Sequence, residues 1–190
     1  MVHSVDKLSL ILFVISAAAI LTITILGLFF AAPDRVQFWP PPAKKTWQHR
    51  CFLILFRLFL YPLVALSILR FEFQPGTAGL VRYLLGGTLF TAGFGLALWI
   101  TLQLGWRNAF GEKLGLMTSS WFAWSRNPIY VVTWLGLLGW AIILNDTNVS
   151  ILLGGWAMLY ILAPFLEEPW LESQYGDSYS QYRKNVRRFF

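Results

Sequence analysis

The fold is decided by residues 125–168, which read SRNPIYVVTWLGLLGWAIILNDTNVSILLGGWAMLYILAPFLEE. This stretch holds two apolar runs, Pro128–Leu144 and Val149–Leu166, separated by four polar residues. Each run has about the length of a bilayer crossing, and a connection this short makes the two helices antiparallel neighbours. Residues 145–147 (NDT) and 148–150 (NVS) both match the N-glycosylation pattern, but helix-stop and N-cap chemistry explains them better. We therefore predict a helical hairpin in the membrane.

The rest of the chain is similarly apolar. Of its 190 residues, 57% are hydrophobic and 13% are charged, which is more apolar surface than a soluble domain of this size can bury. Three further apolar runs lie upstream, at Leu8–Ala32, Cys51–Leu69 and Leu80–Leu104. We expect an all-α integral membrane protein with about five transmembrane helices. Residues 1–79 are predicted to be a two-span bracing region, and residues 80–190 the functional core.

The loops between these runs differ strongly in charge. With five spans, eleven lysines and arginines fall on one side of the membrane, within residues 33–50, 105–127 and 177–190, and three fall on the other. The positive-inside rule assigns the richer side, and with it the C-terminus, to the cytoplasm. Topology therefore explains the net charge of +6, and we expect no nucleic-acid partner.

The C-terminal segment becomes polar and basic from Asp177 onward. Tyr179, Tyr182, Val186 and Phe189 recur at helical spacing, and the basic residues fall largely elsewhere on the helical wheel. This pattern predicts an amphipathic helix at the cytoplasmic interface. Its cations are expected to contact anionic lipid headgroups.

Arg57 is a charged residue inside a predicted span. A charge at that depth costs roughly 3 kcal/mol unless it is solvated or paired, so Arg57 is expected to face a cavity, a partner helix or, in the preferred interpretation, the headgroups. The single Cys51 cannot form an internal disulfide and is interpreted as a core or lipid-facing residue. His3 and His49 have no further ligand at metal-binding spacing, so we expect no metal site.

Two polar groups meet at the cytoplasmic ends of the hairpin. Residues 125–130 lie at its entry, and Glu167 and Glu168 lie at its exit. Two carboxylates beside a helix C-terminus are unfavourable, so a positive charge should compensate them. Arg126 is one candidate and a cationic ligand is another. Water or headgroup-region lysines and arginines are the alternative.

The residues around this polar cluster resemble those of a known family. Residues 116–130, LMTSSWFAWSRNPIY, are similar to the motif of the integral-membrane methyltransferases, which include isoprenylcysteine carboxyl methyltransferase and the phospholipid N-methyltransferases. Glu167 and Glu168, followed by residues 175–186, resemble that family's C-terminal signature. The resemblance covers residues 80–190, with both motifs in order and the hairpin between them.

The resemblance implies a site for S-adenosylmethionine in a cytoplasmic pocket closed by residues 105–127 and the C-terminal segment. A lipophilic or small apolar acceptor, a thiol or a lipid amine, would enter from the bilayer. Methyl transfer from a sulfonium needs alignment and a dry cavity, so no nucleophilic side chain is assigned. The residues expected to bind the cofactor are Leu114, Leu116, Met117, Phe122, Arg126, Asn127, Pro128, Ile129, Tyr130, Glu167 and Glu168.

The sequence departs from the family pattern in three features. Asn127 stands where the isoprenylcysteine branch has a histidine, although both side chains form hydrogen bonds. Ser120 and Trp121 replace a glycine-containing turn. Ala163 matches an arginine that would receive a substrate carboxylate, so carboxyl methylation of a prenylated cysteine is disfavoured here.

Two other classes of function stay open. A catalytically silent membrane scaffold or assembly factor of the same fold would have an occluded or collapsed cofactor pocket. A small transporter would need polar or broken segments near the bilayer midplane, and only Arg57 with Pro62 points that way.

Overall fold

The computed structural model describes residues 2–31, 38–41, 46–105 and 115–190. Within them the chain is all-helical, with no strand. The helices are α1 (Val2–Phe29), α2 (Trp47–Leu69), α3 (Gly76–Leu104), α5 (Trp121–Trp124), α6 (Pro128–Leu144), α7 (Thr147–Tyr175) and α8 (Asp177–Asn185). The all-α fold predicted from composition is therefore confirmed.

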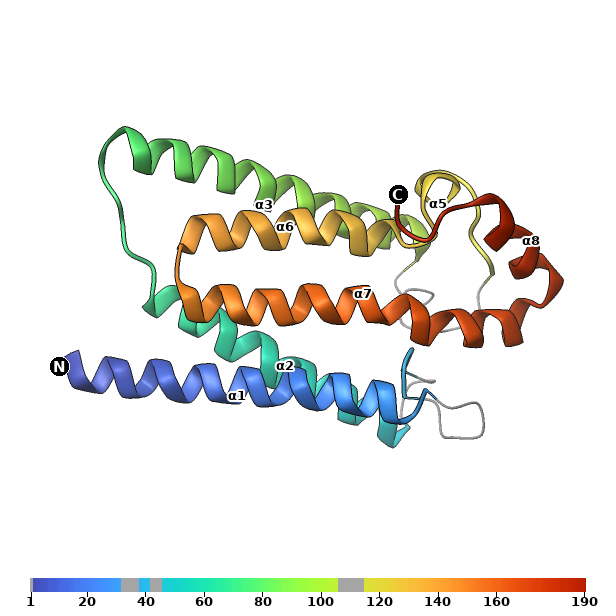
Figure 1. Cartoon of the computed structure of the whole chain (residues 1–190), viewed down its shortest axis with the longest axis horizontal. Helices are drawn as coiled ribbons and strands as arrows, with labels where there is room; N and C mark the ends of the chain where they lie inside the picture. Colours follow the sequence, from blue (N-terminus) through green and yellow to red (C-terminus); the bar gives the residue numbers. More distant parts are fainter. Residues whose placement is uncertain (1, 32–37, 42–45, 106–114) are drawn as a thin grey trace.

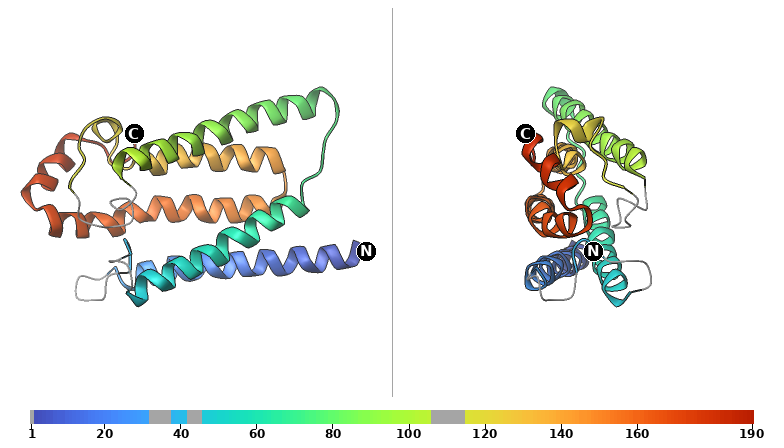
Figure 2. Two further views of the ribbon diagram at one scale, coloured as in Figure 1. Left: turned by 180° about the vertical axis from the view of Figure 1, so that it is seen from behind. Right: turned by 90° about the vertical axis from the view of Figure 1, so that its right-hand side faces the viewer.

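The five long helices form one elongated bundle. Figure 1 shows α1, α3 and α7 running in one direction and α2 and α6 in the other, with the short helices α5 and α8 together at one end. We call this end, where α5 and α8 lie, the site end. Helix α6 packs against both α3 and α7, while α1 packs against α2 and α7. The reverse and end-on views in Figure 2 agree with this arrangement.

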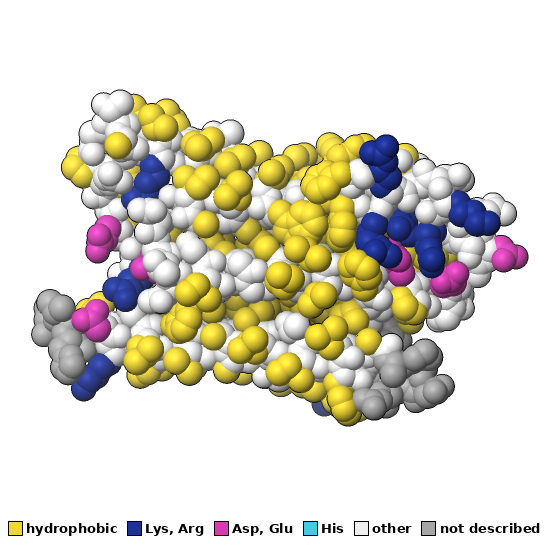
Figure 3. Space-filling model, in the orientation of Figure 1, with side chains coloured by type: hydrophobic (Ala, Val, Ile, Leu, Met, Phe, Trp, Pro, Cys, Tyr) yellow, Lys and Arg dark blue, Asp and Glu magenta, His cyan; other side chains and the backbone are white. Residues whose placement is uncertain are grey.

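Four helices of the described chain are long and apolar enough to cross a membrane: Val5–Phe29, Trp47–Leu69, Gly76–Leu104 and Thr147–Tyr175. The fifth predicted span is α6, which is shorter at 17 residues and spans about 25 Å. Hydrophobic side chains cover the length of the bundle in Figure 3, and the charged groups gather at its two ends. The protein is therefore a multi-pass membrane protein.

Close packing of α3 on α6 depends on small residues. A Cβ atom built on Gly93 would lie 2.1 Å from the backbone nitrogen of Gly136, and one on Gly139 would lie 2.3 Å from the nitrogen of Phe90. Such distances leave no room for any side chain, so the two backbones touch, as they do where small residues line membrane helix interfaces. Gly87 and Gly95 of the same helix instead face open space.

The hairpin between α6 and α7 has the predicted caps. Asn145 adopts the left-handed conformation that ends α6, and its N–H donates to the carbonyl of Ala141 at 2.8 Å. Asp146 caps α7 by accepting from the N–H of Val149 at 2.9 Å. Arg82 of α3 donates to the last carbonyls of α6, including that of Leu144 at 2.7 Å, so a cation stabilises the negative end of that helix.

Helix α7 is longer than the sequence predicted. The expected span ended at Leu166, but the helix continues through Pro164 and Pro169 to Tyr175. Its 29 residues measure about 44 Å, so its last turns extend beyond a hydrocarbon core about 30 Å thick. Glu167 and Glu168 therefore lie within the helix rather than at its C-terminus, and other elements of the fold can contact them.

Helix α8 also differs from its prediction. It is basic along its exposed face, but Tyr179 is only 1% exposed and Tyr182 is 8% exposed, because both pack against Phe122 and Ile100 of the protein. The helix ends at Asn185, so Val186 and Phe189 belong to an extended tail. The expectation of one continuous amphipathic helix was wrong beyond this point, and the apolar face of α8 packs on the bundle.

Ser120 precedes α5 in a backbone conformation that residues with a side chain rarely adopt, with φ of 57° and ψ of −128°. Its N-terminal neighbour Ser119 accepts a hydrogen bond from the N–H of Phe122 at 3.2 Å, which holds the turn in place. Ser120 thus has the backbone conformation that glycine adopts easily, and the family pattern has a glycine-containing turn at this place.

We expect Gly93→Ala to lower the free energy of unfolding by about 1–3 kcal/mol, because the added methyl group forces α3 and α6 apart. Gly95 is on the same helix but faces open space, so Gly95→Ala should leave the free energy of unfolding unchanged or raise it slightly. Thermal unfolding in detergent compares the two variants. Equal melting temperatures for both would contradict the close helix contact.

We expect Ser120→Gly to raise stability by about 1 kcal/mol, since glycine adopts the positive φ without steric strain. Ser119→Gly is the matched control and should lower stability slightly through the greater freedom of the unfolded chain. The same unfolding assay measures both, and a loss of stability in Ser120→Gly would show that the turn is unstrained.

Candidate functional site

A cavity of about 430 Å³ lies at the site end of the bundle. Its walls come from α2, α3, α5, α6, α7 and α8, from the segment before α2 and from the segments on either side of α5. All but one of the residues predicted to bind the cofactor line it, namely Leu116, Met117, Phe122, Arg126, Asn127, Pro128, Ile129, Tyr130, Glu167 and Glu168. Leu114 lies outside the described residues. Two segments far apart in sequence thus meet at one cavity, and the cofactor-binding role of these residues stays a prediction.

The entry to α6 is held by the C-terminal tail. The N–H of Arg126 donates to the carbonyl of Arg187 at 2.9 Å. The carbonyl of Arg188 accepts from the amide Nδ2 of Asn127 at 2.9 Å and from the hydroxyl of Ser125 at 3.2 Å. Pro128 then begins α6 at a position where the missing N–H has no cost. The tail therefore fixes residues 125–127 beside the cavity.

Glu167 is bound by aromatic side chains rather than by a cation. Its Oε1 atom accepts from the indole Nε1 of Trp39 at 2.8 Å and from the phenol of Tyr130. The rings of Tyr130 and Tyr160 lie 4.6 Å apart next to it. No described residue donates a hydrogen bond to the second oxygen, Oε2, although Glu167 lines the cavity. The carboxylate is therefore held at a fixed place with one oxygen left for another donor.

Glu168 is the carboxylate that pairs with arginines. Arg188 donates to it with both ends of its guanidinium, Nε to Oε1 at 2.8 Å and Nη2 to Oε2 at 2.7 Å. The same guanidinium lies over the ring of Phe165, 4.0 Å from its centre. The Glu168 side chain is 7% exposed, so this fork neutralises a buried charge. The hydrogen bonds raise the pKa of Arg188 above its ordinary value.

Arg126 occupies an unusual position between these groups. Its Nη1 atom lies 3.3 Å from Oε1 of Glu168, but the geometry is not that of a hydrogen bond. The side chain is only 9% exposed, and its Nε and Nη1 atoms find no hydrogen-bond partner among the described residues. Buried guanidinium donors without a partner are costly. These two atoms have almost no exposed surface, so Arg126 meets the cavity through the remaining part of its side chain.

The expected compensation of the two glutamates is therefore corrected in one respect. Arg126 was a candidate to pair with either carboxylate, and it lies next to Glu168, whereas Tyr130 and Trp39 bind Glu167. Arg188 was assigned to membrane contacts and is instead the main partner of Glu168. A wheel projection could not find this contact, because α8 ends before Arg188 and the tail turns back on the bundle.

Two tyrosines close the cavity from α8. The phenol of Tyr182 donates to the carbonyl of Phe122 at 2.7 Å, which ties α8 to α5. Burial raises the pKa of Tyr179 to about 12 and the pKa of Tyr182 above its ordinary value as well. Both phenols are neutral near pH 7, so the negative charge in this wall belongs to the glutamates alone.

Several lining residues were not predicted. Trp39, Phe52, Leu53 and Phe56 come from the segment before α2 and from α2 itself. A tryptophan in a proline-rich loop and aromatic residues one helical turn apart were the available signals, but each is also typical of a membrane interface or a helix packing face. Residues 1–79 therefore form part of the cavity wall in addition to packing on α7.

Arg57 lies on the exposed face of α2 and does not line the cavity. Side chains of a helix lean toward its N-terminus, which for α2 is the site end of the bundle. Among the described residues it has no hydrogen bond or ion pair. Arg57 therefore faces neither the cavity nor another described helix, and its placement among the headgroups stays a prediction.

The comparison with known proteins agrees with this geometry. A family model described as phospholipid methyltransferase matches residues 81–178, more than half of the chain. The match includes the entry to α6, the hairpin and both glutamates, and it stops before the tail that carries Arg188. No curated protein and no solved structure matches the chain. The chain belongs to the phospholipid methyltransferase family, within the integral membrane methyltransferases.

Proposed function

We propose that this protein transfers a methyl group from S-adenosylmethionine to a lipophilic acceptor drawn from the bilayer, with the site end facing the cytoplasm. The observation that carries the proposal is one cavity lined both by Glu167, which Tyr130 and Trp39 hold, and by Arg126, which lies next to Glu168. Membership of the family implies methyl transfer at a membrane, and the cavity is a space in which the methyl donor can bind.

The residues of the cavity fit the methyl donor by charge. S-adenosylmethionine, when bound, supplies a methyl group on a positively charged sulfur; a lone pair of the acceptor takes that methyl group, and the sulfur keeps the electrons of the broken bond as a neutral thioether. Glu167 can accept from an ammonium group or ribose hydroxyls. The faces of Tyr130 and Phe122 attract a sulfonium or cover the adenine. Burial of the cavity excludes water from competing as an acceptor.

The apolar half of the cavity suits a lipophilic acceptor. Phe52, Leu53 and Phe56 of α2 line it together with Trp39, and the outer face of α2 carries exposed apolar residues suited to lipid. A thiol or amine at the polar end of an apolar acceptor would reach the methyl donor where this apolar wall meets the polar residues of the cavity. Ala163 is fully buried and does not line the cavity, so no cation there favours a carboxylate acceptor.

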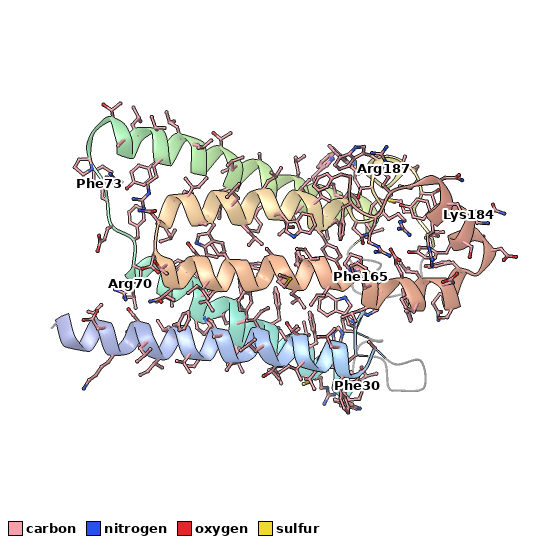
Figure 4. All side chains as sticks on the ribbon, viewed as in Figure 1. Phe30, Arg70, Phe73, Phe165, Lys184 and Arg187 are labelled. Carbon is pink, nitrogen blue, oxygen red and sulfur yellow. The ribbon has the colours of Figure 1, made fainter. Side chains whose placement is uncertain are left out.

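The described charges support a cytoplasmic orientation of the site end. Arg50, Arg126, Arg183, Lys184, Arg187 and Arg188 all belong to the site end, whereas Lys7, Arg70 and Arg82 belong to the other end. The positive-inside rule favours the site end in the cytoplasm. Lys184 and Arg187, labelled in Figure 4, point away from the bundle and are suited to anionic headgroups.

A silent scaffold of the same fold is the competing function. It predicts an occluded or collapsed cavity, whereas the cavity here measures about 430 Å³ and keeps polar atoms without partners in the described chain. A transporter gains no support either, since α2 continues unbroken through Pro62. Neither observation favours these alternatives over methyl transfer.

Calorimetric titration of the detergent-solubilised protein with S-adenosylmethionine tests the proposal. We expect saturable binding at one site per chain. Folded protein that shows no binding would eliminate the proposed function. Labelled-methyl transfer into an extract of membrane lipids and thiols then identifies the acceptor by its labelled product.

Glu167→Gln and Tyr130→Phe should each weaken the binding of S-adenosylmethionine about tenfold, since each removes a charge-assisted interaction worth roughly 1.5 kcal/mol. Glu172→Gln is the matched control on α7. That glutamate is exposed, pairs with Arg183 at 3.2 Å and does not line the cavity. Calorimetry should give the control the wild-type affinity, and unchanged affinity in both test variants would place the cofactor elsewhere.

A further inference from the structure

The tail beyond the matched family region carries Arg188, and its contacts bear on how the cavity receives a ligand. The match ends at residue 178, yet Arg188 binds Glu168, which is buried in the cavity wall. Its carbonyl also accepts hydrogen bonds from Ser125 and Asn127. Arg188 therefore joins α7, the entry to α6 and the tail at a single residue.

The balance of charge at this point is unequal. Arg126 and Arg188 carry two positive charges and Glu168 carries one negative charge, all within hydrogen-bonding or ion-pair distance. Glu167 is the other carboxylate of the cavity, and Tyr130 and Trp39 engage it. One guanidinium is therefore left with its charge unmatched in a place that water reaches poorly, and an anionic ligand group would match it.

Geometry decides which guanidinium is left over. Arg188 takes both oxygens of Glu168 in a fork at 2.8 and 2.7 Å, which is the strongest arrangement for this pair. Arg126 lies 3.3 Å from the same carboxylate without hydrogen-bond geometry, and its Nε and Nη1 atoms stay without partners among the described residues. If the fork were absent, Glu168 would be free to bind Arg126 and occupy those donors.

We infer that Arg188 is a positioning residue: by holding Glu168, it keeps the Arg126 guanidinium available for the carboxylate of the methyl donor. This inference rests on the proposed function and assigns a specific part of the ligand to a specific side chain. Glu167, whose Oε1 atom accepts from Tyr130 and Trp39, is left for the positively charged parts of the same molecule. Arg126 contacts the ligand, and Arg188 acts only through Glu168.

Two ligands that differ by one carboxylate test the inference: S-adenosylmethionine and its decarboxylated form. Binding of each to the full-length protein is measured by calorimetry. The wild type should bind S-adenosylmethionine about tenfold more tightly than the decarboxylated form, the difference expected for one buried charge-assisted contact. Equal affinities in the wild type would overturn the inference while leaving the proposed function in place, whereas no binding of either ligand would overturn both.

Arg188→Gln should weaken the binding of S-adenosylmethionine about tenfold and leave the affinity for the decarboxylated form unchanged, because only the carboxylate contact is lost. Arg126→Gln should have the same selective effect, and the double variant should be no weaker than either single one. Arg188→Lys keeps the charge but cannot form the bidentate pair with Glu168. It should therefore retain part of the preference for S-adenosylmethionine over its decarboxylated form.

Lys184→Gln removes the same charge from exposed α8 and should change neither affinity. A tail that is merely structural would lower both affinities in parallel in Arg188→Gln, and that result contradicts the inference. So does a wild-type preference for the carboxylate that persists in Arg188→Gln. Arg126→Gln leaves the fork intact, so it tests the carboxylate contact even where loss of Arg188 prevents folding.

Discussion

Glu168 is a buried carboxylate at the end of an apolar helix bundle, and the site is organised around its charge. An unpaired carboxylate at such a position costs several kcal/mol, so the fold must bring a cation to it. The fork from Arg188 provides that cation and ties the tail to α7. Once the tail is fixed, its carbonyls hold Ser125, Arg126 and Asn127 beside the cavity. A single ion pair thereby orders three separate parts of the chain.

The two ends of the bundle use charge differently. At the far end, Arg82 caps α6 and Arg70 lies near Asp6 and Asp146, so charges serve helix termini and connections. Figure 4 shows Arg70 and Phe73 at that end, far from Phe165 and Lys184. At the site end, charges line a cavity, and donors stay unpartnered in the described chain. One donor at the far end, Arg70 Nε, also has no hydrogen-bond partner in the described chain, but it lies 3.8 Å from Asp146 and does not line the cavity.

Much of this arrangement could be read from the sequence. The hairpin, its caps at Asn145 and Asp146 and the meeting of Arg126 with Glu168 follow from apolar run lengths and local hydrogen-bonding chemistry. The end of α7 could not be predicted, because prolines and paired carboxylates usually end a helix and here tertiary partners satisfy them. The role of Arg188 was also hidden. The contact between Arg188 and Glu168 forms only when the tail folds back on the bundle, and no local sequence pattern predicts it.

The hydrogen bond from Trp39 to Glu167 joins residues 128 positions apart. It crosses the boundary between the N-terminal helices and the region that matches the family. Phe52 and Phe56 close the same side of the cavity. A chain reduced to the matched region would therefore lose one of the two donors that hold Glu167. The residues that match the family do not enclose the cavity by themselves, because the segment before α2 and α2 itself contribute part of its wall.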